Sequence, residues 1–209
     1  MTLIGFDFSI NKPAACILND NKYTFISWPY GIDIRAVNAF KEAGITIIDR
    51  EDDKDKGEGI TSQMRYEITN SQYLSNLIRE TLKPWLNGDT LIAFEGLSYG
   101  SKGDSGIQLG AYKYMLMDRL SEVVPICNMF TYSPITVKSV AKCAKKGMGK
   151  NEMIVAFIER GPKNKFRMKL FEFPEKFQTP KAKNWIVHLD DLVDSYWVIQ
   201  TLREKEKLF

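Results

Sequence analysis

Histidine is almost absent from this chain of 209 residues, since His188 is the only one. A zinc site built on several histidines is therefore excluded, and acid–base catalysis by histidine has one candidate. Cysteine is also scarce: Cys16, Cys127 and Cys143 are odd in number and lie far apart in the sequence. We expect three reduced thiols and no disulfide or zinc framework. Carboxylates and lysines remain as the main candidates for catalysis.

Long apolar runs are missing as well. No run approaches the roughly 20 residues that a membrane-spanning helix needs. The N-terminus leads directly into a predicted strand, without a cationic leader or a cleavage site. We therefore expect a cytoplasmic protein that does not enter a membrane. A hydrophobic content of 44% and an aromatic content of 12% indicate a globular chain, and its length allows one main core.

Charge is distributed unevenly along the chain. Residues 136–185 contain 13 Lys or Arg and 4 Glu, whereas the rest of the chain contains 16 basic and 22 acidic residues. The small net charge of +3 therefore hides a strongly basic segment. Such a segment suggests a phosphate-rich partner, and a solvated lysine-rich surface is the alternative interpretation.

Short apolar runs bounded by turn residues predict strands, and the first three of them should form an antiparallel meander. These runs cover residues 2–9, 14–18, 23–28, 45–48, 91–95 and 125–132. Apolar spacing and capping residues predict helices over 33–43, 150–159 and 187–205, one helix or a broken pair over 62–86, and others that begin near Ser105 and Pro134. Residues 161–183, rich in Lys, Phe and Pro, should be irregular. Because no repeat or linker divides the chain, we expect one domain over residues 1–209.

Two of the predicted strands carry an acid near their end. The first strand contains Asp7, and the run Leu91-Ile-Ala-Phe-Glu95 lacks alternation, as a strand buried on both faces does. Burial alone would penalise Glu95, so its position requires a reason. The carboxyl end of a central strand, below a polar loop, is where open α/β sheets place their chemistry.

The last predicted helix adds two more acids. Asp191 and Asp194 are three residues apart and project from one face of that helix. Their neighbours are mostly apolar, so the helix should pack inward and bring the acids with it. Together with Asp7 and Glu95 they form an oxygen-ligand set suited to hard divalent cations. The alternative is that Asp190, Asp191 and Asp194 only favour the helix N-terminus through its dipole, which leaves Asp7 and Glu95 unexplained.

The motifs occur in a recognisable order. They are Ile4-Gly-Phe-Asp7, Phe94-Glu95 with Ser101-Lys-Gly-Asp-Ser-Gly-Ile-Gln-Leu-Gly110, Pro134-Ile-Thr-Val-Lys138, Gly149-Lys150-Asn-Glu-Met153 and Asp191-Leu-Val-Asp194-Ser. With these motifs the sequence resembles the RuvC-like Holliday junction resolvases of the ribonuclease H-like superfamily, phage and viral members included. The resemblance covers nearly the whole chain.

The resemblance implies an α/β fold of the ribonuclease H type. Its mixed five-stranded sheet would combine the antiparallel meander with parallel strands, between flanking helices. Segments at about 30–60 and 161–185 look like insertions relative to compact members of the family. The protein would act in the cytoplasm of a host cell if a phage encodes it.

The resemblance also implies a site and a reaction. Asp7, Glu95, Asp191 and Asp194 would bind Mg²⁺, with Mn²⁺ as a substitute, and a homodimer would make paired symmetric cuts in a four-way DNA junction by a two-metal mechanism, leaving 5′-phosphate ends. Lys138 and Lys150 match the family's basic positions near the scissile phosphate. The family's Gly-x-Gly is displaced here, so Lys145 and Lys146 compete with Lys150 for the second position.

Further residues are expected to contact DNA. Tyr99 is the candidate for the aromatic wedge that opens base pairs at the junction, although it stands one residue from the family's position; an ordinary loop tyrosine is the alternative. Phosphate contacts are expected from Lys102, Lys113, Lys142, Lys145 and Lys146. Two other functions stay open: a nuclease for flaps, forks or RNA/DNA hybrids, and a binding scaffold without nuclease activity.

Overall fold

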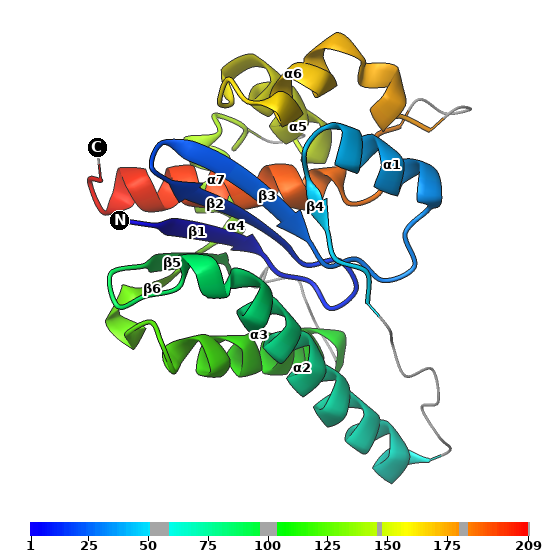
Figure 1. The fold of residues 1–209 in the computed structure, drawn as a ribbon, viewed down its shortest axis with the longest axis vertical. Coiled ribbons are helices and arrows are strands. Elements are labelled where there is room, and N and C mark those ends of the chain that lie inside the picture. Colours follow the sequence, from blue (N-terminus) through cyan, green and yellow to red (C-terminus); the bar gives the residue numbers. More distant parts are fainter. Residues whose placement is uncertain (51–58, 97–103, 146–147, 180–183, 209) are drawn as a thin grey trace.

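The computed structural model describes residues 1–50, 59–96, 104–145, 148–179 and 184–208. They form a single mixed sheet with helices on both faces (Figure 1). The apolar residues divide into two buried clusters, one on each face of the sheet. Such a sheet, covered on both sides, accounts for the apolar runs without alternation in the central strands.

The sheet has the strand order β4-β3-β2-β1-β5-β6. As predicted, β1 (Leu3–Asp7), β2 (Ala14–Asn19) and β3 (Lys22–Ser27) form an antiparallel meander. Next to β1 lies β5 (Leu91–Glu95), followed by β6 (Met129–Tyr132), and both pairings are parallel. The five-stranded sheet implied by the family resemblance is one strand short. The run predicted over 45–48 forms the additional strand, β4 (Thr46–Ile47), a two-residue edge strand parallel to β3.

One face of the sheet carries most of the helices. α7 (Leu189–Lys205) packs directly on β1 and β2, and its residues are buried nearly all round. α4 (Pro134–Val140) and α5 (Lys150–Arg160) pack on α7, while α1 (Ile34–Glu42) lies near β4. α7 is therefore the central helix of this layer (Figure 1). Its position explains why the middle of the helix, residues 192–202, is mostly apolar.

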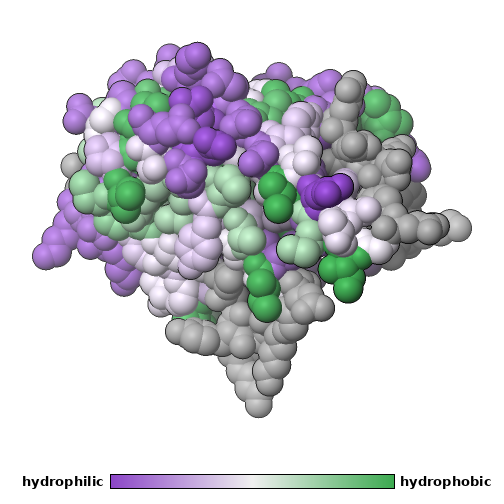
Figure 2. Space-filling model, turned by 90° about the horizontal axis from the view of Figure 1, so that it is seen from below, coloured by the Kyte–Doolittle hydropathy of each residue, from purple (hydrophilic) through white to green (hydrophobic). Residues whose placement is uncertain are grey.

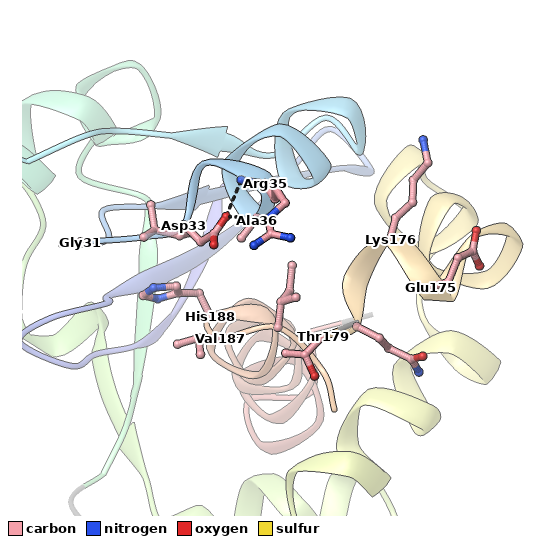
Figure 3. A pocket seen from close by; sticks show the side chains of 12 residues that line it. Gly31, Asp33, Arg35, Ala36, Glu175, Lys176, Thr179, Val187 and His188 are labelled. Carbon is pink, nitrogen blue, oxygen red and sulfur yellow. Dashed lines mark hydrogen bonds and ion pairs between the residues drawn. The ribbon is translucent and has the colours of Figure 1, made fainter. Parts of the chain in front are cut away.

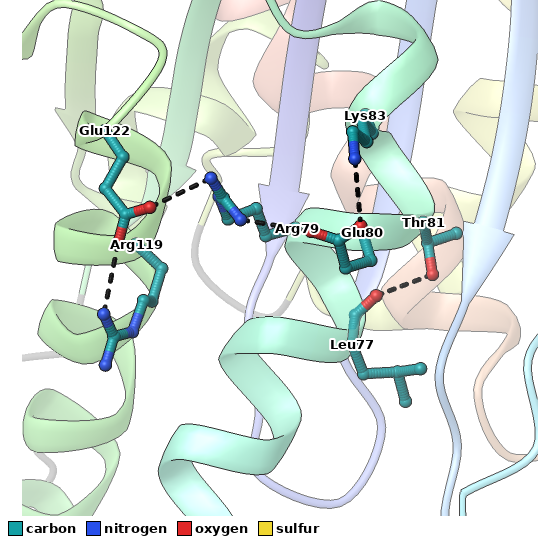
Figure 4. A network of polar contacts seen from close by, with 7 residues as sticks. All are labelled: Leu77, Arg79, Glu80, Thr81, Lys83, Arg119 and Glu122. Carbon is teal, nitrogen blue, oxygen red and sulfur yellow. Dashed lines mark hydrogen bonds and ion pairs between the residues drawn. The ribbon is translucent and has the colours of Figure 1, made fainter.

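The other face is covered by two long helices that pack on each other. They are α2 (Ile60–Leu82) and α3 (Asp104–Ser121), and a short 3₁₀ turn at Lys83–Trp85 ends the first. Arg79 pairs with Glu122 at 2.9 Å and with Glu80 at 3.1 Å, and Arg119 also pairs with Glu122 at 3.1 Å (Figure 4). Each exposed pair contributes little, so the network mainly fixes the relative position of the two helix ends.

The described part of the segment from 161 to 183, residues 161–179, is more regular than we predicted. It contains α6 (Lys165–Glu172), and a 3₁₀ turn at Pro174–Phe177 follows. The side chain of Asn164 accepts a hydrogen bond from the backbone N–H of Arg167 and so caps α6. Phe166 and Leu170, four residues apart, are buried in the core. Two apolar positions in a lysine-rich stretch are too few to indicate a helix by periodicity, so packing decides its formation.

The predicted thiols and the predicted cap of one helix agree with the structure. All three cysteines are free thiols, with Cys16 and Cys143 buried and Cys127 exposed. Ser133 caps α4 through a bond to the N–H of Thr136, and Pro134 occupies the first turn. In the described parts of the chain, no helix combines the length and the apolar character needed to cross a membrane.

Candidate metal centre

Asp7 and Glu95 lie side by side at one edge of the sheet. Each is the last residue of its strand, and the parallel register pairs Phe6 with Phe94 immediately before them. Parallel strands end at the same edge, so both carboxyl groups face the same region. The order of the strands alone therefore brings together two acids that are far apart in the sequence.

The third acid arrives because α7 lies unusually close to β1. A Cβ atom at Gly5 would lie 2.4 Å from the backbone oxygen of Ser195 and 2.9 Å from the backbone nitrogen of Ile199. Only glycine allows this contact of helix backbone with strand backbone. Asp194, which precedes Ser195, is thereby held at the strand ends.

Asp7, Glu95 and Asp194 converge closely enough to share a cation. One carboxylate oxygen from each lies within 4.8 Å of the other two. The Oδ1 atom of Asp194 is buried and has no hydrogen-bond partner among the described residues. Buried acceptors without a donor fit the needs of a hard divalent cation, which binds carboxylate oxygens.

The electrostatics of the cluster point the same way. Burial raises the pKa of Asp7 well above its usual value, and the charges of Asp191, Glu95 and Asp194 raise it further. Burial likewise raises the pKa of Asp194, and the charge of Glu95 raises it further. Burial also raises the pKa of Glu95, and the charge of Lys138 partly offsets that rise. Carboxyl groups forced together in this way become stable as anions only beside positive charge.

Asp191 lies next to this triad but has a cationic neighbour of its own. Its Oδ2 is 3.5 Å from Lys12 Nζ and 3.9 Å from Nδ1 of His188. Burial raises the pKa of Asp191 to about 6, and Asp190 adds to the effect. Burial and Lys12 lower the pKa of His188 to about 4, so this histidine is neutral at pH 7.

Two lysines approach the triad from α4 and α5. Lys150, the first residue of α5, contacts Asp190 through its Nζ, and its charge lowers the pKa values of Asp7, Glu95 and Asp194. Burial acts to lower the pKa of Lys150 itself, but the contact with Asp190 outweighs it and raises that pKa. Lys138, half-buried on α4, is the largest of the charges that lower the pKa of Glu95.

Comparisons with known proteins bear on the fold. Neither a protein-family model nor a curated protein matches this sequence. A solved structure of Thermus thermophilus RuvC matches 99% of this chain and 97% of its own, with a TM-score of 0.52 and 12% identity. The structure of the same RuvC in complex with a Holliday junction substrate matches 98% of this chain and 96% of its own, with a TM-score of 0.51 and 11% identity.

The chain has the RuvC fold. The predicted ribonuclease H-like class is thereby confirmed, with six strands in place of five. A fowlpox virus resolvase bound to Holliday junction DNA also matches, over 99% of both chains, with a TM-score of 0.48 and 13% identity.

On this RuvC fold, the residues predicted to contact DNA lie in different environments. Lys142 and Lys145 are exposed in the segment between Lys138 on α4 and Lys150 on α5. Tyr99, Lys102 and Lys146 lie outside the described residues. Their roles, and those of all the predicted site residues, stay predictions.

Lys113 does not lie where a phosphate contact requires it. It is 6% exposed, and its Nζ donates a 2.9 Å hydrogen bond to the backbone oxygen of Glu95. Burial lowers its pKa to about 8, while Glu95 acts in the opposite direction. The Nζ also lies 5.4 Å from the ring centre of Phe94. This geometry favours a role in holding the end of β5.

Lys12 and Asp190 are site residues that sequence reasoning did not select. Lys12 follows β1 in a turn without any periodic pattern, and its side chain returns to Asp191. Asp190 was considered only as a helix-terminal acid, yet it holds Lys150 against the cluster. The signal for Lys12 was its short distance in sequence from Asp7, which places it near the same sheet edge.

Proposed function

We propose that this protein is a metal-dependent endonuclease that cuts branched DNA, in the manner of a Holliday junction resolvase. The convergence of Asp7, Glu95 and Asp194 at the carboxyl ends of β1 and β5 carries this proposal. The RuvC fold supports it, because one matching structure is RuvC in complex with a Holliday junction substrate. A cluster of three carboxylates on this fold is the arrangement that phosphodiester hydrolysis with divalent cations requires.

The metal ligands would be Asp7, Glu95 and Asp194, with Asp191 as the fourth once a second cation takes the place of Lys12. We expect Mg²⁺, with Mn²⁺ as a substitute, because all the donors are carboxylate oxygens. When bound, a pair of such ions lowers the pKa of a water molecule and stabilises the leaving oxygen. Other residues of the chain would shield these carboxylates from bulk water and supply the remaining positive charge.

Lys150 and Lys138 would supply that charge. Both already lower the pKa of Glu95, so each can stabilise anionic charge at the strand ends. Charge that develops on a phosphate in the transition state is stabilised by a cation fixed in advance at such a place. Lys150 and Lys145 are both exposed, but the contact with Asp190 fixes Lys150 beside the acids and favours it over Lys145.

The protein would act as a homodimer, because a symmetric junction requires two related cuts. The N-terminal halves of α2 and α3 offer a surface for the partner. A groove between them includes Met64, Ile68 and Ile107, which are 58%, 53% and 74% exposed. Seen from the side of these helices, hydrophobic side chains reach the surface at several separate places, with more polar ones between them (Figure 2).

The substrate is tested by incubating the protein with a labelled four-way junction, a flap, a fork and an RNA/DNA hybrid, with and without Mg²⁺. The proposal expects Mg²⁺-dependent cutting of the junction at paired positions. Preferential cutting of another member of the panel would keep the nuclease and change its substrate. Junction binding without cutting under any metal condition would contradict the enzyme and favour a scaffold.

Glu95→Gln tests the metal ligands. Removal of one carboxylate from the triad should reduce kcat by at least about 100-fold while junction binding stays within about twofold, because the side chain holds the cation and not a phosphate. Single-turnover cleavage and binding measured by fluorescence anisotropy separate the two effects. Equal cutting by the variant and the wild type would remove Glu95 from the site.

Lys150→Ala tests the proposed stabilisation of the transition state. The variant should lose about 10- to 100-fold in kcat with a smaller change in KM, because charge at the scissile phosphate develops during the reaction. Lys163→Ala is a matched control, since Lys163 is an exposed lysine after the end of α5. A loss confined to KM in Lys150→Ala would assign the catalytic position to another lysine.

A further inference from the structure

A cavity of about 540 Å³ lies between the start of α1 and the segment that leads into α7 (Figure 3). Ile32 and Ala36 line it on one side, and Gln178, Thr179, Ile186 and His188 line it on the other. Its volume is within the range of small-molecule sites. Both walls come from the two segments that we predicted as additions to the compact fold, or from residues directly next to them.

The walls are fixed by the core and by backbone pairing. Phe177 is buried, and its ring centre lies 6.2 Å from that of Phe40 in α1. Gln178 forms an antiparallel bridge with Trp185, and the N–H of Ile186 donates to the oxygen of Phe177 at 2.8 Å. Asp33 accepts from the N–H of Arg35 and so caps α1. The cavity is therefore preformed.

The lining combines apolar walls with polar and charged side chains, which include Asp33, Arg35, Glu175 and Lys176. Ile32, Ala36 and Ile186 offer carbon surface, and the side-chain amide of Gln178 can both donate and accept hydrogen bonds. A flat ring with hydrogen-bonding groups at its edge, as in a nucleobase, fits both the carbon surface and the amide.

The cavity adjoins the metal centre. His188 lines the cavity, and its Nδ1 is only 3.9 Å from Asp191 Oδ2 in the acid cluster. Lys12 is paired with the same oxygen and is partly exposed, so it can contact a phosphate between the cavity and the acids. A DNA strand with one phosphate at the acids would therefore have a neighbouring base within reach of the cavity.

We propose that the cavity takes an unstacked base of the cut strand, next to the scissile phosphate, and so contributes to the choice of the cleavage position. This inference rests on the proposed nuclease function and assigns a role to the two additional segments. The closeness of His188, a residue of the cavity wall, to Asp191 favours a base of the bound strand over a free small molecule. Extrusion of a base costs least where the duplex is already open, as at a junction centre.

The experiment places 2-aminopurine at successive positions around the centre of a four-way junction and measures its fluorescence on binding to metal-free protein. One position should brighten, because the base leaves the stack. Ala36→Phe, which fills the cavity, and Gln178→Ala, which removes the edge contact but leaves the walls, should both abolish that signal while junction affinity changes less than about threefold. Gln72→Ala, an exposed glutamine on α2, is the matched control.

A second measurement uses cleavage. An abasic site at the responsive position should lower kcat/KM by about tenfold for the wild type, the loss expected for one base contact. The same abasic site should lower the kcat/KM of the Gln178→Ala variant little further. Junction cutting with no responsive position, or with a signal that both variants retain, overturns the cavity while the nuclease stands. Absence of binding to any DNA overturns both the cavity proposal and the proposed nuclease function.

Discussion

Asp191 is the carboxyl group whose protonation reports most directly on the charge of the site. Its pKa is raised to about 6, so between about pH 4 and pH 6 the folded chain binds a proton that the unfolded chain has already released. Stability should therefore fall as the pH rises through this window. For this one group the difference is about 2 to 3 kcal/mol.

The measurement is urea unfolding of metal-free protein at a series of pH values, for wild type and Asp191→Asn. The stability difference between the two should grow in favour of the variant as the pH rises from about 4 to 7, because the variant has no carboxyl group to ionise there. Asp118→Asn, at an exposed position on α3, is the control. Parallel curves for the wild type and Asp191→Asn would contradict the raised pKa.

The acids could be predicted from the sequence because each departs from its local pattern. Asp7 and Glu95 end apolar strands, and Asp191 and Asp194 have mostly apolar neighbours on α7. A charge in such a place needs a function or a partner. Lys12 breaks no pattern, since a lysine in a turn is ordinary, and only the return of the meander brings it to Asp191.

At the level of the elements, the contact of α7 with β1 determines whether the acids can meet. Gly5→Ala introduces a methyl group 2.4 Å from the oxygen of Ser195 and 2.8 Å from Cγ1 of Ile199, so the helix must move away from the strand. Overpacking of this kind costs about 1 to 3 kcal/mol. The movement separates Asp194 from Asp7 and Glu95, and Mn²⁺ affinity should fall at least about tenfold.

Thermal unfolding and Mn²⁺ titration calorimetry measure the two effects of Gly5→Ala. Gly88→Ala is a matched control, because no atom lies within 4 Å of the position that its Cβ would take. The control should change stability by less than about 0.5 kcal/mol and leave Mn²⁺ binding as it is. If Gly5→Ala left the unfolding temperature unchanged, α7 could move away from β1 without a loss of stability.

The elements themselves were predicted well where a pattern was long. The meander, β5, α5 and α7 follow from apolar runs and capping residues. α6 was missed because its formation depends on Phe166 and Leu170 entering a core that the rest of the chain builds. The close approach at Gly5 was equally hidden, since a glycine in a strand does not say which partner it admits.

At the scale of the whole molecule, the proposed dimer would bring two acid clusters into one assembly. Each chain presents its acids at one edge of the sheet, whereas the exposed apolar residues of α2 and α3 lie on the opposite face from α7 (Figure 1). Association through these helices would leave the basic segment on the α7 side free for DNA. Steep salt dependence of junction binding would follow from that segment.

Met64→Glu combined with Ile68→Glu tests this surface. Both side chains are more than half exposed on α2, so the change should leave the fold intact and place like charges at the proposed twofold interface. The wild type should sediment as a dimer and the variant as a monomer, with a dimer dissociation constant raised at least about 100-fold. The monomer should nick a junction on one strand and lose the paired cut.

The control is Lys83→Glu, an exposed position at the opposite end of α2, which should stay dimeric. If the double variant is also a dimer, the partner binds on another face. If the wild type is a monomer and still makes paired cuts, the two sites are not linked by protein contacts.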